Sequence, residues 1–145
     1  MKKKIVLISC VSKKETEACK AKDMYVSPLF KMSWEYAKQF SPDAVFILSD
    51  MYHLLDPEQQ IAPYDEVLTK SAQWKKWAGT VLHDLEEKLK EKGIRLEQTE
   101  FIILAGKKYW KYLLGENGIR KCQLPLSGHG GIGCILHFLK EKTSK

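Results

Sequence analysis

The stretch IVLISC (residues 5–10), followed by VSKKETEACKAKDMYVSPLF (residues 11–30), decides the fold. Residues 5–8 are apolar and β-branched, with lysines before them and polar residues after them, which is typical of a buried parallel strand. Cys10 then falls at the carboxyl end of that strand, where open α/β sheets bind their ligands. The roughly twenty residues that follow show no regular pattern, and a loop of that length in a compact domain indicates a functional segment.

Further strands and helices are expected on either side of this loop. The strands are predicted at residues 44–48, 101–105 and 119–124, and the helices at 30–40, 74–89, 107–114 and 132–139. Ser71 is the expected N-cap of the second of these helices, and Gly93 is expected to end it.

This alternation of strands and helices predicts an α/β fold. We expect a three-layer arrangement, with a mostly parallel four-stranded sheet and helices on both faces, in a single domain over residues 1–145. Right-handed crossovers would bring the loops after all four strands to one edge of the sheet. Those loops begin near Cys10, Ser49, Gly106 and Leu126.

The composition narrows the class of protein. The chain has 145 residues and a formal net charge of +6. A positive charge favours an anionic partner, either a small molecule such as a nucleotide or a nucleic acid. The alternative is that surface lysines that serve only solubility account for the same net charge. The opening apolar stretch is too short for a signal peptide and no stretch would span a membrane, so a cytoplasmic protein without a membrane partner is expected. The four cysteines form no CxxC pair, so neither a metal site nor a disulfide is expected.

The first loop supplies the first candidate catalytic residues, Cys10 and Lys14. A thiol at a strand end beside lysines favours the thiolate, so Cys10 is a candidate nucleophile; the alternative is a small buried side chain at the end of a core strand. Ser9 precedes it at the same strand end and is a candidate ligand-binding residue.

The same loop offers groups that would hold an anion. Lys13, Lys14 and Lys22 are candidate clamps for phosphate or carboxylate, and the alternative is a solvated loop. Tyr25 and Ser27 lie two residues apart in an extended stretch, and so on the same side of it, which favours a shared hydrogen-bonding target.

The segment from Ser49 to Asp65 is rich in titratable groups. Asp65 is the candidate general base or hydroxyl-binding carboxylate, with helix capping as its alternative. Ser49, Tyr52, His53 and Tyr64 are candidate ligand-binding residues, although a histidine in such a loop is more often simply satisfied by its neighbours.

The glycine-rich run SGHGGIG precedes the last helix. Gly128, His129, Gly130 and Gly131 are candidate contacts for a phosphate or ribose, since free N–H groups there point at an anion; the alternative is a tight turn. Gly106 is a further candidate at the turn after the third strand. The run is not a Walker loop, because no GK[ST] follows, and it is not placed as a dinucleotide fingerprint, so no cofactor is expected.

Aromatic and basic residues alternate in KKYWKYLL (residues 107–114) and in WKKW (residues 74–77). Such runs occur where bases stack on a nucleic-acid-binding face. An amphipathic helix with lysines on its solvent face and tryptophans on its buried face has the same sequence pattern, and we favour that interpretation.

These motifs together resemble an uncharacterised bacterial domain family with the patterns SCxxxK, AKDxYxSxLF, LSxxYGLLxPxxxIxPYD and PLxGxGxG. Here they fall at Ser9 to Lys14 and at residues 21–30, 48–65 and 125–133, with His53 where glycine is expected and His129 inside the glycine loop. The third pattern is also similar to a segment of YaaA-type peroxide-stress proteins. The first is more distantly similar to the lysine-transfer domain of archaeosine synthase, which implies a nucleobase or nucleic acid as ligand.

Two hypotheses follow for the function. The first is an enzyme, a transferase or hydrolase, that acts on a nucleotide, nucleobase or nucleic-acid base in a strand-end pocket. The second is a non-catalytic nucleic-acid-binding or stress-response module. A deep pocket favours the first, and a broad basic stripe favours the second.

Overall fold

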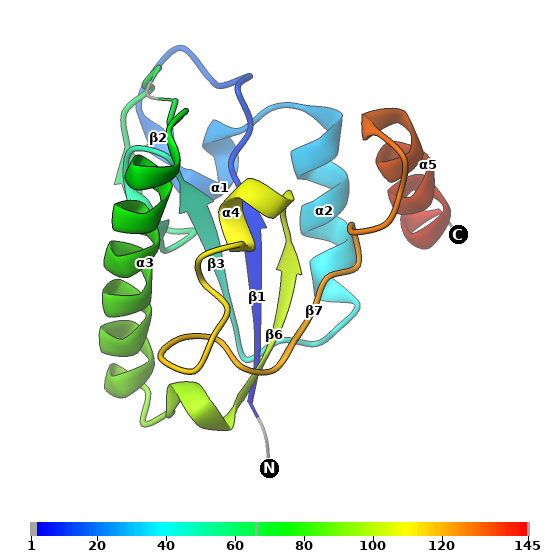
Figure 1. Cartoon of the computed structure of the whole chain (residues 1–145). Helices are drawn as coiled ribbons and strands as arrows, with labels where there is room; N and C mark the ends of the chain where they lie inside the picture. The colour runs from blue at the N-terminus through cyan, green and yellow to red at the C-terminus, as the bar shows by residue number, and fades with distance from the viewer. Residues whose placement is uncertain (1–2, 66, 145) are drawn as a thin grey trace.

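A computed structural model describes residues 3–65 and 67–144 and shows an α/β domain around one mixed sheet (Figure 1). The strand β1 pairs in parallel with both β3 and β6, β7 is parallel to β6, and β4 is antiparallel to β3. The order is β4-β3-β1-β6-β7, with bounds β1 (Lys3–Ser9), β3 (Ala44–Ser49), β4 (His53–Leu55), β6 (Thr99–Leu104) and β7 (Cys122–Gln123). The α/β class and the mostly parallel sheet are therefore confirmed, whereas the expected count of four strands was wrong.

The extra strand is β4, which folds back on β3 through a short turn and pairs His53 with Ser49. A strand of three residues is too short to show the alternation that identifies strands in a sequence. The two long loops also pair with each other, because β2 (Cys19–Lys20) and β5 (Gln60–Ile61) form a small antiparallel sheet. The first loop is thus not irregular throughout, as the sequence indicated.

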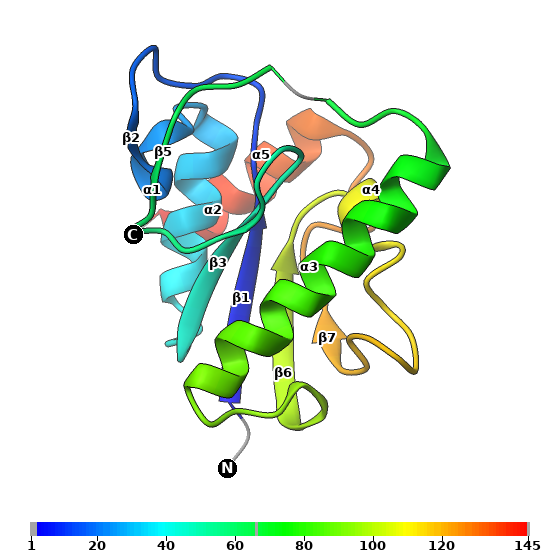
Figure 2. The same cartoon turned by 90° about the vertical axis from the view of Figure 1, so that its left-hand side faces the viewer.

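The helices lie along the central strands, which are fully buried at residues 5–8 and 101–104. Figures 1 and 2 show α2 and α5 together on one side of the strands and α3 on the other. The bounds are α1 (Ala21–Met24), α2 (Pro28–Lys38), α3 (Ser71–Glu91), the 3₁₀ helix η1 (Leu96–Gln98), α4 (Lys107–Trp110) and α5 (Ile132–Thr143). None of the described helices is both long enough and apolar enough to cross a membrane.

The ends of α3 test two predictions. The N-cap position is Lys70 rather than Ser71, because the Gln73 side chain accepts hydrogen bonds from the backbone N–H groups of Thr69 and Lys70 and so starts the helix one residue earlier. Gly93 does follow the helix in the left-handed region, with φ of +71°, as expected of a terminating glycine.

The fourth predicted strand is shorter than residues 119–124. Only Cys122 and Gln123 pair with β6. Upstream, the N–H of Ile119 donates to the carbonyl of Leu113, and the carbonyl of Ile119 accepts from the N–H of Gly115. Both backbone groups of Ile119 are therefore hydrogen-bonded within a local turn, and they do not pair with β6.

His53 stands in the left-handed region with φ of +66°, where a β-carbon is strained. Glycine is the residue that adopts this conformation at least cost. We expect His53→Gly to stabilise the protein by about 0.5–1 kcal/mol, measured by urea denaturation, because the strain relieved exceeds the extra entropy of an unfolded glycine. Ser41→Gly, at φ of +49°, is a control of the same sign. A destabilised His53→Gly variant would show instead that the imidazole itself stabilises the fold.

Candidate functional site

A cleft of about 400 Å³ lies at the carboxyl ends of β1 and β6. After β1 the chain adds β3 on one side, and it later adds β6 on the other side, so the gap between β1 and β6 is the point where the strand order reverses. Open α/β sheets bind ligands at this topological switch point. The lining residues from the strand ends are Ser9, Cys10, Leu104, Ala105 and Gly106.

The remaining walls of the cleft are mainly apolar. Leu29 and Phe30 come from α2, while Ile132 and Ile135 come from α5. Polar groups are few: Ser12, Ser33, Lys108 and Tyr109 join Ser9 and Cys10. Apolar walls with a few polar groups are typical of pockets for small, partly aromatic ligands.

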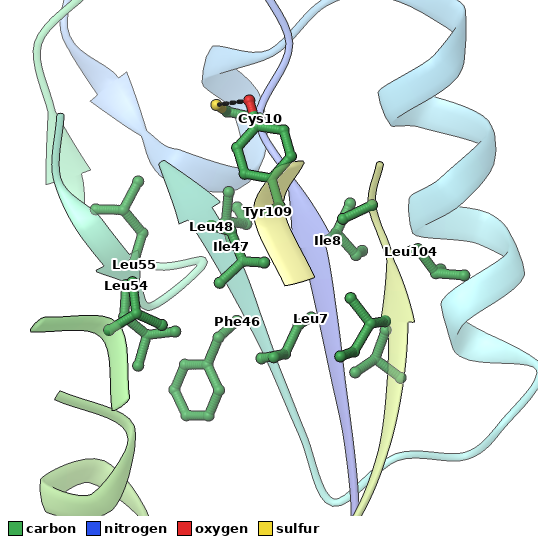
Figure 3. Close-up of a cluster of buried hydrophobic side chains, with 14 of the residues drawn as sticks. Leu7, Ile8, Cys10, Phe46, Ile47, Leu48, Leu54, Leu55, Leu104 and Tyr109 are labelled. Atoms are coloured by element: carbon green, nitrogen blue, oxygen red, sulfur yellow. Dashed lines mark hydrogen bonds between the residues drawn. The ribbon is translucent and has the colours of Figure 1, made fainter. Parts of the chain in front are cut away.

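Cys10 and Tyr109, which line this cleft, meet Asp50 in a buried cluster. The Tyr109 hydroxyl donates to Asp50 Oδ1 at 2.9 Å, and the Cys10 thiol lies 3.5 Å from that oxygen and 3.5 Å from the Tyr109 oxygen. Asp50 Oδ2 accepts from the backbone N–H of Leu68 at 3.1 Å. Figure 3 shows Cys10 and Tyr109 facing each other above the apolar side chains of the strands.

A second chain of hydroxyl groups adjoins the first. Ser49 donates to the Tyr64 hydroxyl at 2.7 Å, and the hydroxyls of Tyr64 and Tyr25 lie 2.7 Å apart. The Lys14 ammonium lies over the Tyr64 ring, 4.4 Å from its centre. The two long loops therefore meet at the strand ends through tyrosines 39 residues apart in the sequence.

The state of Cys10 differs from the sequence-based expectation. Burial raises the pKa of its thiol, hydrogen bonding from Tyr109 lowers it in part, and the nearby charge of Asp50 raises it again. No lysine offsets this, because Lys14 lies over Tyr64. The resting form is thus the thiol, and the expected stabilisation of a thiolate by lysines was wrong.

The three clustered tyrosines are also held protonated. Burial is the largest cause that raises the pKa values of Tyr25, Tyr64 and Tyr109, with the neighbouring Cys10 adding to it. Among the described residues, every buried side-chain nitrogen or oxygen has a hydrogen-bond partner. The thiol and the three tyrosine hydroxyls of the site are therefore neutral groups, and the buried polar atoms around them are all hydrogen-bonded.

The carboxylate in the site is Asp50 rather than Asp65. Asp50 is 6% exposed, whereas Asp65 is exposed in the loop after Tyr64, and no described residue bonds to its side chain. Asp65 also does not cap α3, which begins six residues later. The neighbouring Tyr64 points inward, and successive residues of an extended chain point to opposite sides, so Asp65 points outward.

Three other residues of the first loop, Lys13, Lys22 and Ser27, lie outside the cluster. The Ser27 side chain accepts from the N–H of Phe30 and caps α2, so it shares no target with Tyr25. Lys22 forms an ion pair with Glu58 at 2.8 Å, and Lys13 is exposed. The structure therefore does not gather Lys13, Lys14 and Lys22 into one clamp.

The candidates of the second loop divide between the cluster and its support. Tyr52 packs edge-on against the Tyr64 ring and donates its N–H to Ser49 Oγ, which holds both residues in place. His53 closes the turn into β4 and is half-buried. Gly106 lines the cleft and precedes α4.

The glycine run forms a turn beside the cleft without lining it. Gly128 has φ of +84°, and Gly130 and Gly131 are exposed at the start of α5. His129 Nε2 is hydrogen-bonded to the carbonyl of Pro125 at 2.9 Å, and its ring packs on Phe138. The wall of the cleft here is made by Leu126, Ile132 and Ile135 on either side of the run.

Sequence reasoning missed Asp50 and Tyr109 as site residues. Asp50 directly follows a predicted strand, a position that should have outranked the later Asp65. Tyr109 gave no such signal, because its helical spacing in KKYWKYLL is that of an ordinary apolar face. In residues 3–65 and 67–144, no three His, Cys, Asp or Glu side chains are grouped to hold a metal ion.

A family model matches most of the chain. The profile of a family described as a family of unknown function, DUF6884, matches residues 5–141, which include every residue of the cleft and of the cluster. No curated protein matches the chain significantly.

Proposed function

The chain belongs to the DUF6884 family, and we propose that it is an enzyme that acts on a nucleobase, free or within a nucleotide or nucleic acid, bound between the ends of β1 and β6. The observation that carries this proposal is the cleft at the topological switch point, with the buried Cys10–Asp50–Tyr109 cluster beside it. Buried titratable groups beside a cleft are a common mark of active sites.

The cleft favours a flat, partly apolar ligand. Its walls carry leucine, isoleucine and phenylalanine side chains, and Ser9, Cys10 and Tyr109 are polar groups in its lining that would contact the edge of a bound ring. The volume of about 400 Å³ is within the range of small-molecule sites. The resemblance of two sequence patterns to YaaA-type proteins and to the lysine-transfer domain of archaeosine synthase supports the same class of ligand.

Cys10 and Asp50 have the arrangement of a nucleophile and its base. The thiol points its proton at the carboxylate, and the Tyr109 hydroxyl contacts both groups. When a ligand excludes water from the cleft, transfer of that proton to Asp50 would leave a thiolate. The thiolate would add to an electrophilic ring carbon of the base as the C=N π bond of that carbon opens and its electron pair moves to the ring nitrogen.

The first test is titration with free nucleobases and nucleosides, followed by amide chemical shifts. We expect chemical-shift changes at Ala105 and Gly106, which line the cleft. We expect none at Arg95 or Gly118, which line a separate pocket beside η1. The proposal would be contradicted by chemical-shift changes confined to the pocket beside η1, or by the absence of any change at millimolar ligand.

A blocking variant sharpens this test. Ile132 lines the cleft with its side chain 58% exposed, so Ile132→Trp would fill the mouth without disturbing the core. We expect base affinity to fall by about tenfold or more, because the indole occupies the ligand's apolar contact surface. The matched control is Val67→Trp, since Val67 is 62% exposed and does not line the cleft. Equal affinities in the two variants would place the ligand elsewhere.

The second candidate is a nucleic-acid-binding module without catalysis, which the net charge of +6 favours. Such a module would bind with a steep salt dependence and would not need the buried thiol. Cys10→Ala separates the two, since an enzyme that uses the thiol would lose turnover by about 100-fold or more, whereas a simple binder would keep its affinity.

A further inference from the structure

Three lysines converge at the junction of α3 and α4. The ammonium groups of Lys75 and Lys111 both lie near the Tyr112 ring, at 5.6 and 5.4 Å from its centre. Lys108 lies 5.7 Å from the centre of the Trp74 ring and 5.3 Å from that of Tyr109. We call Lys75, Lys108 and Lys111 the α3–α4 lysine patch.

This patch is strongly and uniformly positive. Its three lysines are exposed, and none forms an ion pair with a carboxylate of the described residues. The surrounding chain, residues 67–83 and 101–115, contains no aspartate or glutamate at all. Lys3, Lys20, Lys22 and Lys38 do form ion pairs with carboxylates, so the patch differs from those parts of the surface by having no acidic residue in the segments that carry it.

The rings under the patch are not free to stack on bases. Trp74 and Tyr109 are 6% and 8% exposed, and they pack edge-on against each other. Trp74 and Tyr109 are thus buried as the amphipathic-helix interpretation predicts, whereas Trp110 and Tyr112 are only half-buried and α4 ends at Trp110. The rings of Trp74, Tyr109 and Tyr112 instead hold ammonium groups at the surface by cation–π contacts, with the N–H groups of the lysines left for another partner. The patch offers charge rather than stacking.

The patch is continuous with the cleft. Lys108 lines the cleft, and the Tyr109 ring beneath it carries the hydroxyl that bonds to Asp50. A ligand that placed a base in the cleft and continued outward over α4 would meet Lys108 first and then Lys111 and Lys75.

We propose that the α3–α4 lysine patch binds the phosphates of a single-stranded nucleic acid whose base occupies the cleft. This inference rests on the proposed function and narrows its substrate from a free base to a polynucleotide. Unpaired lysines suit a phosphate backbone, which repels carboxylates and is attracted to each ammonium group. A base inside a duplex would have to leave the stack to enter the cleft, so a single strand is the easier substrate.

The test is the affinity of fluorescently labelled single-stranded RNA and DNA oligonucleotides across salt concentrations. The patch variant is Lys75→Gln with Lys111→Gln, because neither residue lines the cleft. We expect it to bind oligonucleotides about tenfold more weakly and to lower the slope of log affinity against log salt by about one to two. Its affinity for free nucleobase should equal that of the unaltered protein.

The matched control is Lys90→Gln with Lys92→Gln, which removes the same charge from exposed lysines at the far end of α3. We expect it to leave the slope unchanged. If free base binds in the cleft but the patch variant behaves like this control, the inference is wrong and the proposed function stands. If no base binds at all, the proposed function fails, and the inference fails with it.

Two comparisons of ligand complete the design. A duplex of the same sequence that binds as tightly as the single strand would overturn the single-stranded assignment. A poly-glutamate peptide of equal charge that binds as tightly as the oligonucleotide would show that the patch takes acidic protein instead.

Discussion

Raising the pH above about 9 is expected to destabilise this protein steeply, because four buried acidic groups stay protonated only in the folded state. The ordinary pKa is 9.0 for a cysteine thiol and 10.0 for a tyrosine hydroxyl, and folding raises the pKa of Cys10, Tyr25, Tyr64 and Tyr109 above these values. A raised pKa gives stability that is complete below the unfolded value and is lost as the pH rises toward the folded value. The window therefore opens near pH 9 and extends through the alkaline range.

The size of this effect follows from proton linkage. Each group that is ionised only in the unfolded state costs about 1.4 kcal/mol of unfolding free energy per pH unit, so the four together cost about 5 kcal/mol per unit. Since a domain of this size has a total stability of about 5–15 kcal/mol, unfolding should be complete within about one to three pH units above 10. Urea denaturation at successive pH values from 7 to 11 measures the slope.

A matched pair of variants identifies the groups responsible. Tyr25→Phe removes one titrating hydroxyl and should lower the slope by about 1.4 kcal/mol per pH unit. Tyr112→Phe removes a hydroxyl outside the cluster from a half-exposed ring and should leave the slope as it is. A stability that stays flat between pH 8 and 11 would mean that the cluster ionises without unfolding.

Asp50→Ala is expected to destabilise the protein by about 2–4 kcal/mol at neutral pH. The buried carboxylate accepts from Tyr109, from the Cys10 thiol and from the N–H of Leu68, and its loss leaves these donors without an acceptor. Each buried unsatisfied donor costs about 1–3 kcal/mol, offset in part because a charge is no longer buried. The midpoint of urea denaturation measures the change.

Asp65→Ala is the control for this variant, because it removes the same group from an exposed position without a described partner. We expect its effect to be within about 0.5 kcal/mol of zero. In a Tyr109→Phe background, Asp50→Ala should cost at least about 1 kcal/mol less, since the strongest donor is already gone. If Asp50→Ala raised the stability instead, the burial of its charge would outweigh its hydrogen bonds, and the carboxylate would be retained for function alone.

Some parts of the fold could be predicted from short stretches of sequence. The apolar run at residues 5–8 predicted a buried central strand because a parallel strand is covered on both faces, and residues 101–104 carry the same signal. The spacing from Trp74 to Leu89 predicted α3, since it repeats at the helical period. Both sequence patterns are strong because burial requires an apolar side chain at every residue of the strand and at every turn of the helix.

Other parts left no such signal. The strands β2, β5 and β7 have two residues each, and their pairing is decided by a partner far away in the sequence. A two-residue strand has no period, so only the tertiary structure shows that the two long loops pair with each other.

For the candidate site, the sequence by itself determined which segments follow the carboxyl ends of the parallel strands, and these segments supply Cys10, Ser49, Tyr25 and Tyr64. Only the tertiary structure decided which groups touch. It brought Tyr109 from a helix 99 residues away to Cys10, and it turned Asp50 inward and Asp65 outward. The physical reason is that an edge of a sheet is set by local strand patterns, whereas hydrogen bonds within about 3 Å depend on how the helices and loops pack over that edge.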